Sequence, residues 1–135
     1  GDTFRKAGIT TDYANDIEDD IYINGDRERL KQVFFNMLDN AMKHGGDGGK
    51  IDMSIFREGK NVRIKIRDYG AGISEDELPY VKMKFYKGKS KAQGNGIGLA
   101  VSDEIVNLHG GQLDIESREG EGTTITITLP VKEEV

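Results

Sequence analysis

Three short segments of the chain carry residue types suited to binding a nucleotide together with its metal ion. They are residues 36–44, which hold two asparagines and a lysine, and the glycine-rich turns at 68–73 and 94–99. An amide oxygen can ligate a hard cation such as Mg²⁺, a lysine can meet a phosphate as a point charge, and glycines let a ligand approach the backbone closely. None of the segments is decisive alone, but together they make a specific signal.

The first segment lies in a predicted helix that begins after Asp26, a favourable N-cap, and ends at the glycine cluster 45–49. Asn36, Asn40 and Lys43 share one stripe of this helix, beside the apolar stripe, so we expect them at the rim of the core. Two solvent-facing asparagines beside a lysine would give the same pattern, and the helix alone leaves that alternative open. The apolar residues at helical spacing are Leu30, Val33, Phe34, Met37, Leu38 and Ala41.

The second segment places a carboxylate at the end of an alternating strand. Asp68 can only accept hydrogen bonds, so it suits the exocyclic amine of adenine and would repel the oxygen of guanine. Gly70 and Gly72 would let a flat base approach the backbone. An ordinary Asp-x-Gly turn has the same sequence, and that alternative also stays open.

The third segment leads directly into a helix predicted from about Leu99 to Leu108. Gly94, Gly96 and Gly98 would free backbone N–H groups to face phosphate oxygens, and the dipole of the following helix would assist. Residues 82–98 hold five lysines and four glycines, a composition typical of a mobile loop that could steer an anion. The spacing Gly-x-Gly-x-Gly does not match the dinucleotide-binding fingerprint.

Composition narrows the function classes. The 135 residues suffice for one domain with a single core. The net charge of -5 argues against broad nucleic-acid binding, and the absence of cysteine excludes disulfides and thiolate metal sites. No apolar run approaches the roughly 18 residues that would suggest a membrane-spanning helix.

The predicted elements imply an α/β two-layer sandwich: a mixed, mostly antiparallel sheet of about five strands with about three helices on one face. Ser74 and Glu77 have capping-box spacing, and Pro79 should keep the helix that follows short. A hairpin turn is expected at 58–60. Strands are expected at Ile9–Asn15, Ile21–Asn24, 51–55, 62–66, around Leu113 and Ile115, and at 124–129.

In this order, the segments resemble the catalytic ATP-binding domain of bacterial two-component sensor histidine kinases, in the GHKL superfamily of gyrase, heat-shock chaperone and mismatch-repair ATPases. The resemblance runs from about Asp26 to Pro130 and implies the Bergerat ATP-binding fold. The five matching motifs are an N box at 36–44, a G1 box at 68–72, an F box at 84–87, a G2 box at 94–98 and a G3 box at 120–123.

The resemblance also implies roles for individual residues. Asn40 would coordinate Mg²⁺ with Asn36 assisting, Lys43 would contact phosphate, Asp68 would accept from the adenine amine, and residues 86–95 would form a lid over ATP. Lys87 stands where the family often has arginine, and Ile125 where phenylalanine is frequent. The residues expected to bind ATP or ADP are Asn36, Asn40, Lys43, His44, Asp68, Gly70, Gly72, Ile73, Tyr86, Lys87, Gly94, Gly96, Ile97, Gly98, Leu99 and Thr123.

One position favours phosphoryl transfer over hydrolysis. The hydrolytic relatives carry a glutamate where this chain has Asn36, and an asparagine cannot act as a base. The acceptor expected from the resemblance is a histidine on a separate dimerisation domain. Neither His44 nor His109 is followed by an acidic residue in a hydrophobic helix, so we expect that domain to be absent from these 135 residues and residues 1–8 to be a tag remnant or linker.

The expected function is therefore that of a histidine kinase catalytic domain. It would bind Mg-ATP and donate the γ-phosphate to a histidine of a dimerisation domain in the same parent polypeptide, with a response regulator downstream. We expect a cytoplasmic, monomeric domain that contacts neither nucleic acid nor membrane, whether or not its parent is membrane-anchored. A serine kinase of the anti-sigma-factor type and a non-catalytic interaction module are the alternatives.

Overall fold

The computed structural model describes residues 10–15, 22–23, 25–45, 48–82 and 98–132. Two α-helices, α2 (Arg27–Gly45) and α3 (Gly98–Leu108), and a short 3-10 helix, η2 (Leu78–Tyr80), accompany five strands. None of the described helices is long and apolar enough to cross a membrane. The strands are β1 (Thr10–Asn15), β2 (Lys50–Glu58), β3 (Asn61–Asp68), β4 (Gln112–Arg118) and β5 (Gly122–Pro130).

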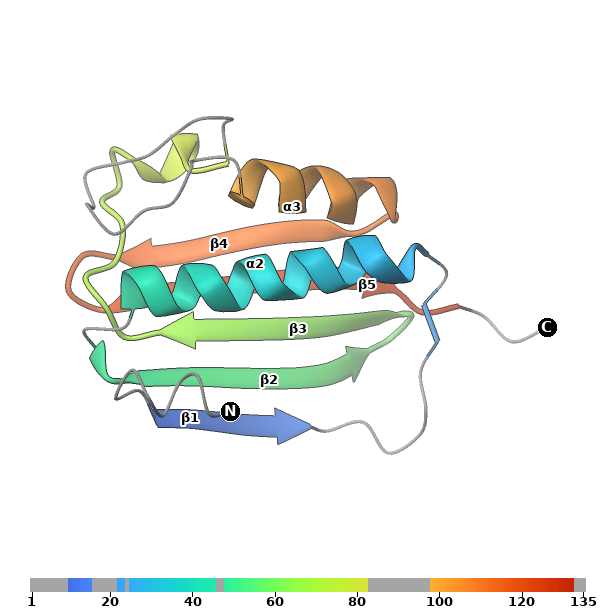
Figure 1. The fold of residues 1–135 in the computed structure, drawn as a ribbon, viewed down its shortest axis with the longest axis horizontal. Helices are drawn as coiled ribbons and strands as arrows, with labels where there is room; N and C mark the ends of the chain where they lie inside the picture. Colours follow the sequence, from blue (N-terminus) through green and yellow to red (C-terminus); the bar gives the residue numbers. More distant parts are fainter. Residues whose placement is uncertain (1–9, 16–21, 24, 46–47, 83–97, 133–135) are drawn as a thin grey trace.

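The five strands form one mixed sheet in the order β1-β2-β3-β5-β4. β1 runs parallel to β2, and every other pairing is antiparallel. Both α-helices lie on the same face of this sheet (Figure 1). The predicted two-layer sandwich with a mostly antiparallel sheet is confirmed.

Helix α2 forms where the sequence predicts it. The Oδ1 atom of Asp26 accepts hydrogen bonds from the backbone N–H groups of Glu28 (3.0 Å) and Arg29 (3.2 Å), so Asp26 is the N-cap, as expected. The stripe of Val33, Met37 and Ala41 is buried against the sheet. Burying three apolar side chains at helical spacing fixes which side of α2 faces the core.

The strands obey the period-two pattern of the sequence. Ile64 on β3 pairs with Ile127 on β5, and Ile66 pairs with Ile125; all four are buried. The predicted hairpin turn joins β2 to β3 at Gly59, whose φ of 62° favours glycine. The helix-facing rows of the sheet are therefore apolar over most of their length, up to the end where β3 reaches Asp68.

One expectation about the elements needs correction. Tyr22 and Ile23, expected in a strand at Ile21–Asn24, belong to no regular element, although the backbone oxygen of Tyr22 accepts a hydrogen bond from Lys132 N at 2.7 Å. The expectation of about three helices fits the two α-helices and the 3-10 helix η2, and Pro79 limits η2 to a single turn as predicted. The first expected strand is present as β1, and Ile9 lies outside the described residues.

Candidate nucleotide site

The site is built on one row of residues at an end of the sheet. Pairing places Ile51, Asp68, Thr123 and Ser117 side by side across β2, β3, β5 and β4. This row continues the core face, yet three of its four members are polar, and Asp68 and Thr123 are buried. Buried polar groups are costly unless they have partners, so this end of the sheet is specialised.

Asp68 is 3% exposed, and its Oδ1 atom accepts a hydrogen bond from Gly70 N at 3.0 Å. Its backbone is crossed closely by Gly122, where a Cβ would come within 2.0 Å of the Asp68 carbonyl oxygen. Gly122 has φ 94°, so glycine is required there both for its conformation and for the lack of a side chain. The start of β5 thus fixes the position of Asp68.

Ser117 organises the polar row and was missed by the sequence analysis. Its hydroxyl donates to Gly122 O (2.8 Å) and accepts from Ile73 N (2.7 Å). Because a hydroxyl has one proton, the 2.8 Å contact with Thr123 Oγ1 must have Thr123 as donor. The alternation of the sequence could have revealed it, because Ser117 follows Leu113 and Ile115 at the spacing of residues that share one face of a strand.

The turn after β3 is held against the turn between β4 and β5. Gly72 has φ 75°, and a Cβ there would come within 2.0 Å of Arg118 O. The N–H of Gly120 donates to Ala71 O at 2.7 Å. The packing of these two turns therefore requires glycine at position 72, whether or not a base lies beside it.

The asparagines of α2 lie at the rim of the core, as predicted. Asn36 and Asn40 are half-buried, one turn apart. The Nδ2 group of Asn36 donates to the fully buried Ser102 Oγ on α3 at 3.3 Å, so Asn36 joins the two helices. Within the described part of the chain, the Asn40 amide has no hydrogen-bond partner, and its oxygen can serve as a hard ligand.

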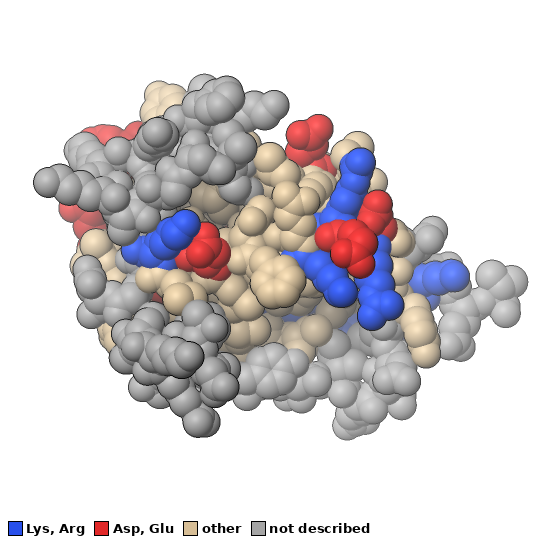
Figure 2. Space-filling view, viewed as in Figure 1, with Lys and Arg blue, Asp and Glu red and all other residues tan. Residues whose placement is uncertain are grey.

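Lys43, which was expected to contact phosphate, and Lys82, one of the five lysines of residues 82–98, have partners within the protein. Lys43 pairs with Asp39 at 3.0 Å on the exposed side of α2, a contact worth only a few tenths of a kcal/mol, which a phosphate could displace. Lys82 pairs with Asp103 on α3 and donates to Leu113 O at 3.1 Å, so it is a structural contact. On the face in Figure 2, basic side chains lie beside acidic ones rather than forming one basic patch.

The pieces of the site gather at one end of the molecule. The last turn of α2, the end of β3, the start of β5 and the start of α3 all lie at the left of Figure 1. Gly48, after α2, approaches so closely that a Cβ there would come within 2.1 Å of Tyr69 O. Segments far apart in the sequence thus surround Asp68, as the order of the predicted motifs requires.

On the opposite face of the sheet, a polar cluster supports this end. Tyr69 donates a short hydrogen bond to Asp52 Oδ2, and Lys50 and Arg67 lie over the Tyr69 ring. The hydrogen bond to Asp52 is the main cause that raises the pKa of Tyr69, and burial adds to it. The cluster fixes the residue directly after Asp68.

Several predicted site residues are not tested by this geometry. Tyr86, Lys87, Gly94, Gly96 and Ile97 lie outside the described residues. His44 and Gly98 lie in α2 and α3, and Leu99 packs against the core. Among the described residues no three His, Cys, Asp or Glu side chains converge on a metal site. An amide oxygen such as that of Asn40 fits Mg²⁺ only if nucleotide and water supply the other ligands.

Comparison with known proteins follows the same motifs. Residues 25–133 match the family described as histidine kinase-, DNA gyrase B-, and HSP90-like ATPase. Sensor histidine kinase WalK of Bacillus subtilis is 39% identical over 121 residues, which are 85% of this chain and 20% of WalK. Sensor histidine kinase ZraS of Escherichia coli is 39% identical over 109 residues, 81% of this chain and 23% of ZraS. The chain thus spans about a fifth of the length of these relatives.

Solved structures agree with the sequence comparison. The catalytic domain of histidine kinase ThkA superposes with a TM-score of 0.82 at 29% identity, covering 96% of this chain and 83% of that domain. The mycobacterial sensor histidine kinase MprB gives a TM-score of 0.83 at 27% identity, covering 98% of this chain and 91% of that structure.

Proposed function

This chain belongs to the family of histidine kinase-, DNA gyrase B- and HSP90-like ATPases, and from that membership we propose that it binds Mg-ATP and presents the γ-phosphate to a histidine of a partner domain. The observation that carries the proposal is the row in which buried Asp68 lies beside Thr123, at the end of the sheet where α2 also ends (Figure 1). Asn40 lies in the C-terminal half of α2. The proposed site thus combines an acceptor for the base with an oxygen ligand for the metal.

Asp68 would accept the hydrogen bond of the adenine amine. Its carboxylate is buried and is fixed by Gly70 N and by the close crossing of Gly122. A buried carboxylate can only accept hydrogen bonds, so it discriminates strongly against a ligand that presents an oxygen at the same place. We therefore propose adenine rather than guanine as the base.

Asn40 would hold Mg²⁺ through its side-chain amide oxygen, and Asn36 would assist through its own amide oxygen. Asn36 keeps that oxygen while its Nδ2 group donates to Ser102. When bound, the metal would neutralise part of the charge of the phosphates. Lys43 would exchange its exposed pairing with Asp39 for a phosphate oxygen.

Two observations support transfer to an external acceptor. Asn36 cannot act as a general base, so the described part of the site lacks the group that hydrolytic relatives use to activate water. Both ring nitrogens of His109 contact backbone atoms, which leaves that histidine without a nitrogen to accept a phosphoryl group. We propose that the acceptor lies on a dimerisation domain of the same parent, with a response regulator downstream and the reaction in the cytoplasm.

Nucleotide binding is tested by titrating the chain with Mg-ATP in a calorimeter. We expect saturable binding that Asp68→Asn weakens by roughly tenfold or more, because a charged acceptor of a buried hydrogen bond is lost. Asp114→Asn makes the same chemical change on an exposed residue of β4 and should leave the affinity unchanged. An unsubstituted chain that binds no nucleotide would overturn the proposal.

Phosphoryl transfer is tested by adding a histidine-bearing dimerisation domain and ATP labelled at the γ-phosphate. We expect label on that domain that is lost in acid and retained in base, as a phosphohistidine requires. Asn40→Ala should abolish labelling, and Asn107→Ala, which removes an amide from α3, should not. Acid-stable label on a serine-bearing protein would favour the serine-kinase alternative, and binding without transfer to any acceptor would favour the interaction module.

A further inference from the structure

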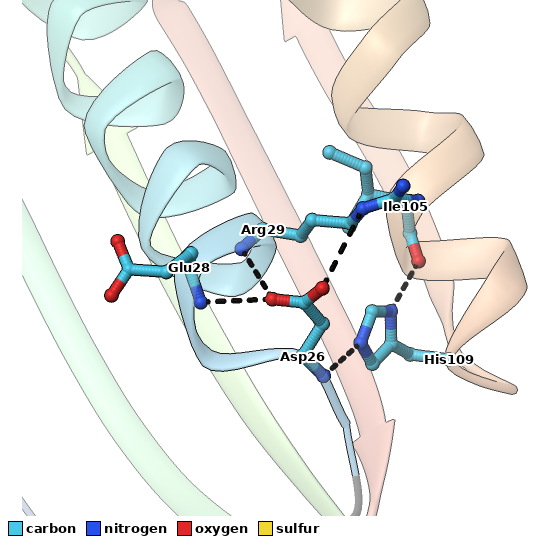
Figure 3. Close-up of polar contacts among 5 residues, drawn as sticks. All are labelled: Asp26, Glu28, Arg29, Ile105 and His109. Carbon is cyan, nitrogen blue, oxygen red and sulfur yellow. Dashed lines mark hydrogen bonds and ion pairs between the residues drawn. The ribbon is translucent and has the colours of Figure 1, made fainter.

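His109 joins the end of α3 to the beginning of α2. Its Nδ1 atom lies 2.7 Å from Ile105 O, and its Nε2 atom lies 2.9 Å from Asp26 N (Figure 3). A carbonyl oxygen can only accept and a backbone N–H can only donate, so the proton is on Nδ1 and Nε2 accepts. The contacts therefore fix the ring as one neutral tautomer.

The backbone around the ring is shaped to receive it. A Cβ at Gly25 would lie 2.2 Å from Cδ2 and 2.6 Å from Nε2 of His109, so only glycine leaves room for the ring. The residue that His109 holds, Asp26, is also the N-cap of α2. His109 thus fixes the point from which α2 starts.

A second polar contact joins the same two helices further along. Asn36 on α2 donates to Ser102 on α3. The contacts at Asp26 and at Asn36 are roughly 15 Å apart along α2, since a helix rises about 1.5 Å per residue. Two separated contacts fix both the translation and the rotation of α2 relative to α3, and Asn40 lies one turn beyond the second contact.

We propose that His109 is a positioning residue for the nucleotide site: its unprotonated Nε2 holds α2 so that Asn36 and Asn40 are presented in the geometry that Mg-ATP requires. This inference rests on the proposed function, since it names a residue that acts on the same site from the far end of two helices. His109 touches neither nucleotide nor metal in this account. It acts through the position of α2.

The contact is sensitive to protonation. A proton on Nε2 would set an N–H group against the N–H of Asp26 and would break the hydrogen bond. Figure 3 draws three charged side chains at this junction: Asp26, whose carboxylate caps α2, Arg29, which pairs with Asp26 at 3.7 Å, and Glu28, which points away from the ring.

Two substitutions distinguish the contact of Nε2 with Asp26 from the contact of Nδ1 with Ile105. His109→Asn can still donate to Ile105 O but is too short to reach Asp26, whereas His109→Gln can place an amide oxygen at the Nε2 position and does not titrate. We expect the Asn variant to bind Mg-ATP roughly three- to tenfold more weakly at neutral pH, and the Gln variant to bind within about twofold of the unsubstituted chain.

The same pair tests the proton dependence. Protonation of ATP changes the dissociation constants of the unsubstituted chain and of the Gln variant by the same factor, so their ratio is free of that effect. That ratio should rise as the pH falls, because a proton on Nε2 would break the hydrogen bond from Asp26 N. Equal affinity of the Asn variant and the unsubstituted chain, or a ratio that does not change with pH, would overturn the inference.

The contact between His109 and Asp26 can also be measured in the unsubstituted chain, so this test does not depend on the folding of a variant. NMR should show the His109 ring protonated on Nδ1 at neutral pH and the Asp26 amide protected from exchange, with that protection lost on acidification. An Asp26 amide that exchanges freely at neutral pH would overturn the inference while leaving nucleotide binding untouched. If instead the unsubstituted chain fails to bind Mg-ATP while the Asp26 amide is protected, the proposed function has failed and the positioning role fails with it.

Discussion

At the scale of residues, three glycines of the site hold neighbouring backbone segments together. Gly48, Gly72 and Gly122 each lie where a Cβ would come within about 2 Å of another segment's backbone. The sequence shows that these positions are glycine but not which neighbour forbids a side chain, because that neighbour is distant in the sequence. Their shared role is to bring three loops together around Asp68.

Replacing Gly122 by alanine tests this role. We expect Gly122→Ala to destabilise the fold by about 2–4 kcal/mol and to weaken nucleotide binding, because the added methyl group collides with Asp68 O as well as straining a residue at φ 94°. Gly120→Ala is the matched control: φ there is 80°, but nothing lies within 4 Å of the added atom. Urea unfolding of both variants measures the difference, and equal losses would show that strain alone matters.

The Tyr69–Asp52 pair predicts a pH dependence. Its hydrogen bond keeps the pKa of Tyr69 above the usual value, so the neutral phenol is favoured in the folded chain. The resulting stabilisation is fully present below the pKa of an unfolded tyrosine, about 10, and is lost as pH rises through the higher pKa of the folded chain.

Tyrosinate absorbance during alkaline titration measures this directly. The difference between the unsubstituted chain and Tyr69→Phe isolates Tyr69, and Asp52→Asn should move its titration to lower pH because the main cause of the rise is removed. A Tyr69 titration that is the same with Asp52 and with Asn at that position would contradict the assignment.

At the scale of elements, α2 is the part of the site that the sequence predicts best. Its N-cap, its buried stripe and the rim position of its asparagines all follow from spacing, since helical period and capping chemistry are local. Its two contacts with α3 are not local. Neither the hydrogen bond from Asn36 to Ser102 nor that from Asp26 to His109 has a signature in the spacing of the residues.

The N-cap contribution is measurable alone. Asp26→Ala should destabilise the chain by about 1 kcal/mol, because the N–H groups of Glu28 and Arg29 lose their acceptor. Asp26→Asn keeps an acceptor in the same place and should cost much less, since the exposed pairing with Arg29 contributes little. The comparison is made by urea unfolding, and a larger loss for Asn than for Ala would exclude capping as the cause.

At the scale of the whole molecule, the sequence predicts the two-layer sandwich and the order of the motifs around one site. Alternation along β3 and β5 is enough to predict which face meets the helices. The strand order is a different matter, because nothing local says that β5 inserts between β3 and β4. Tyr22 and Ile23 show the limit of local patterns: two apolar residues near a turn read as a strand, yet their backbone joins no sheet.

The parallel pairing of β1 with β2 has a mechanical consequence. The chain leaves β1 and returns to the neighbouring strand only after passing through α2, so this helix is tethered at both ends to adjacent strands at one border of the sheet. The two strands of this border therefore hold both ends of the helix that carries Asn36 and Asn40.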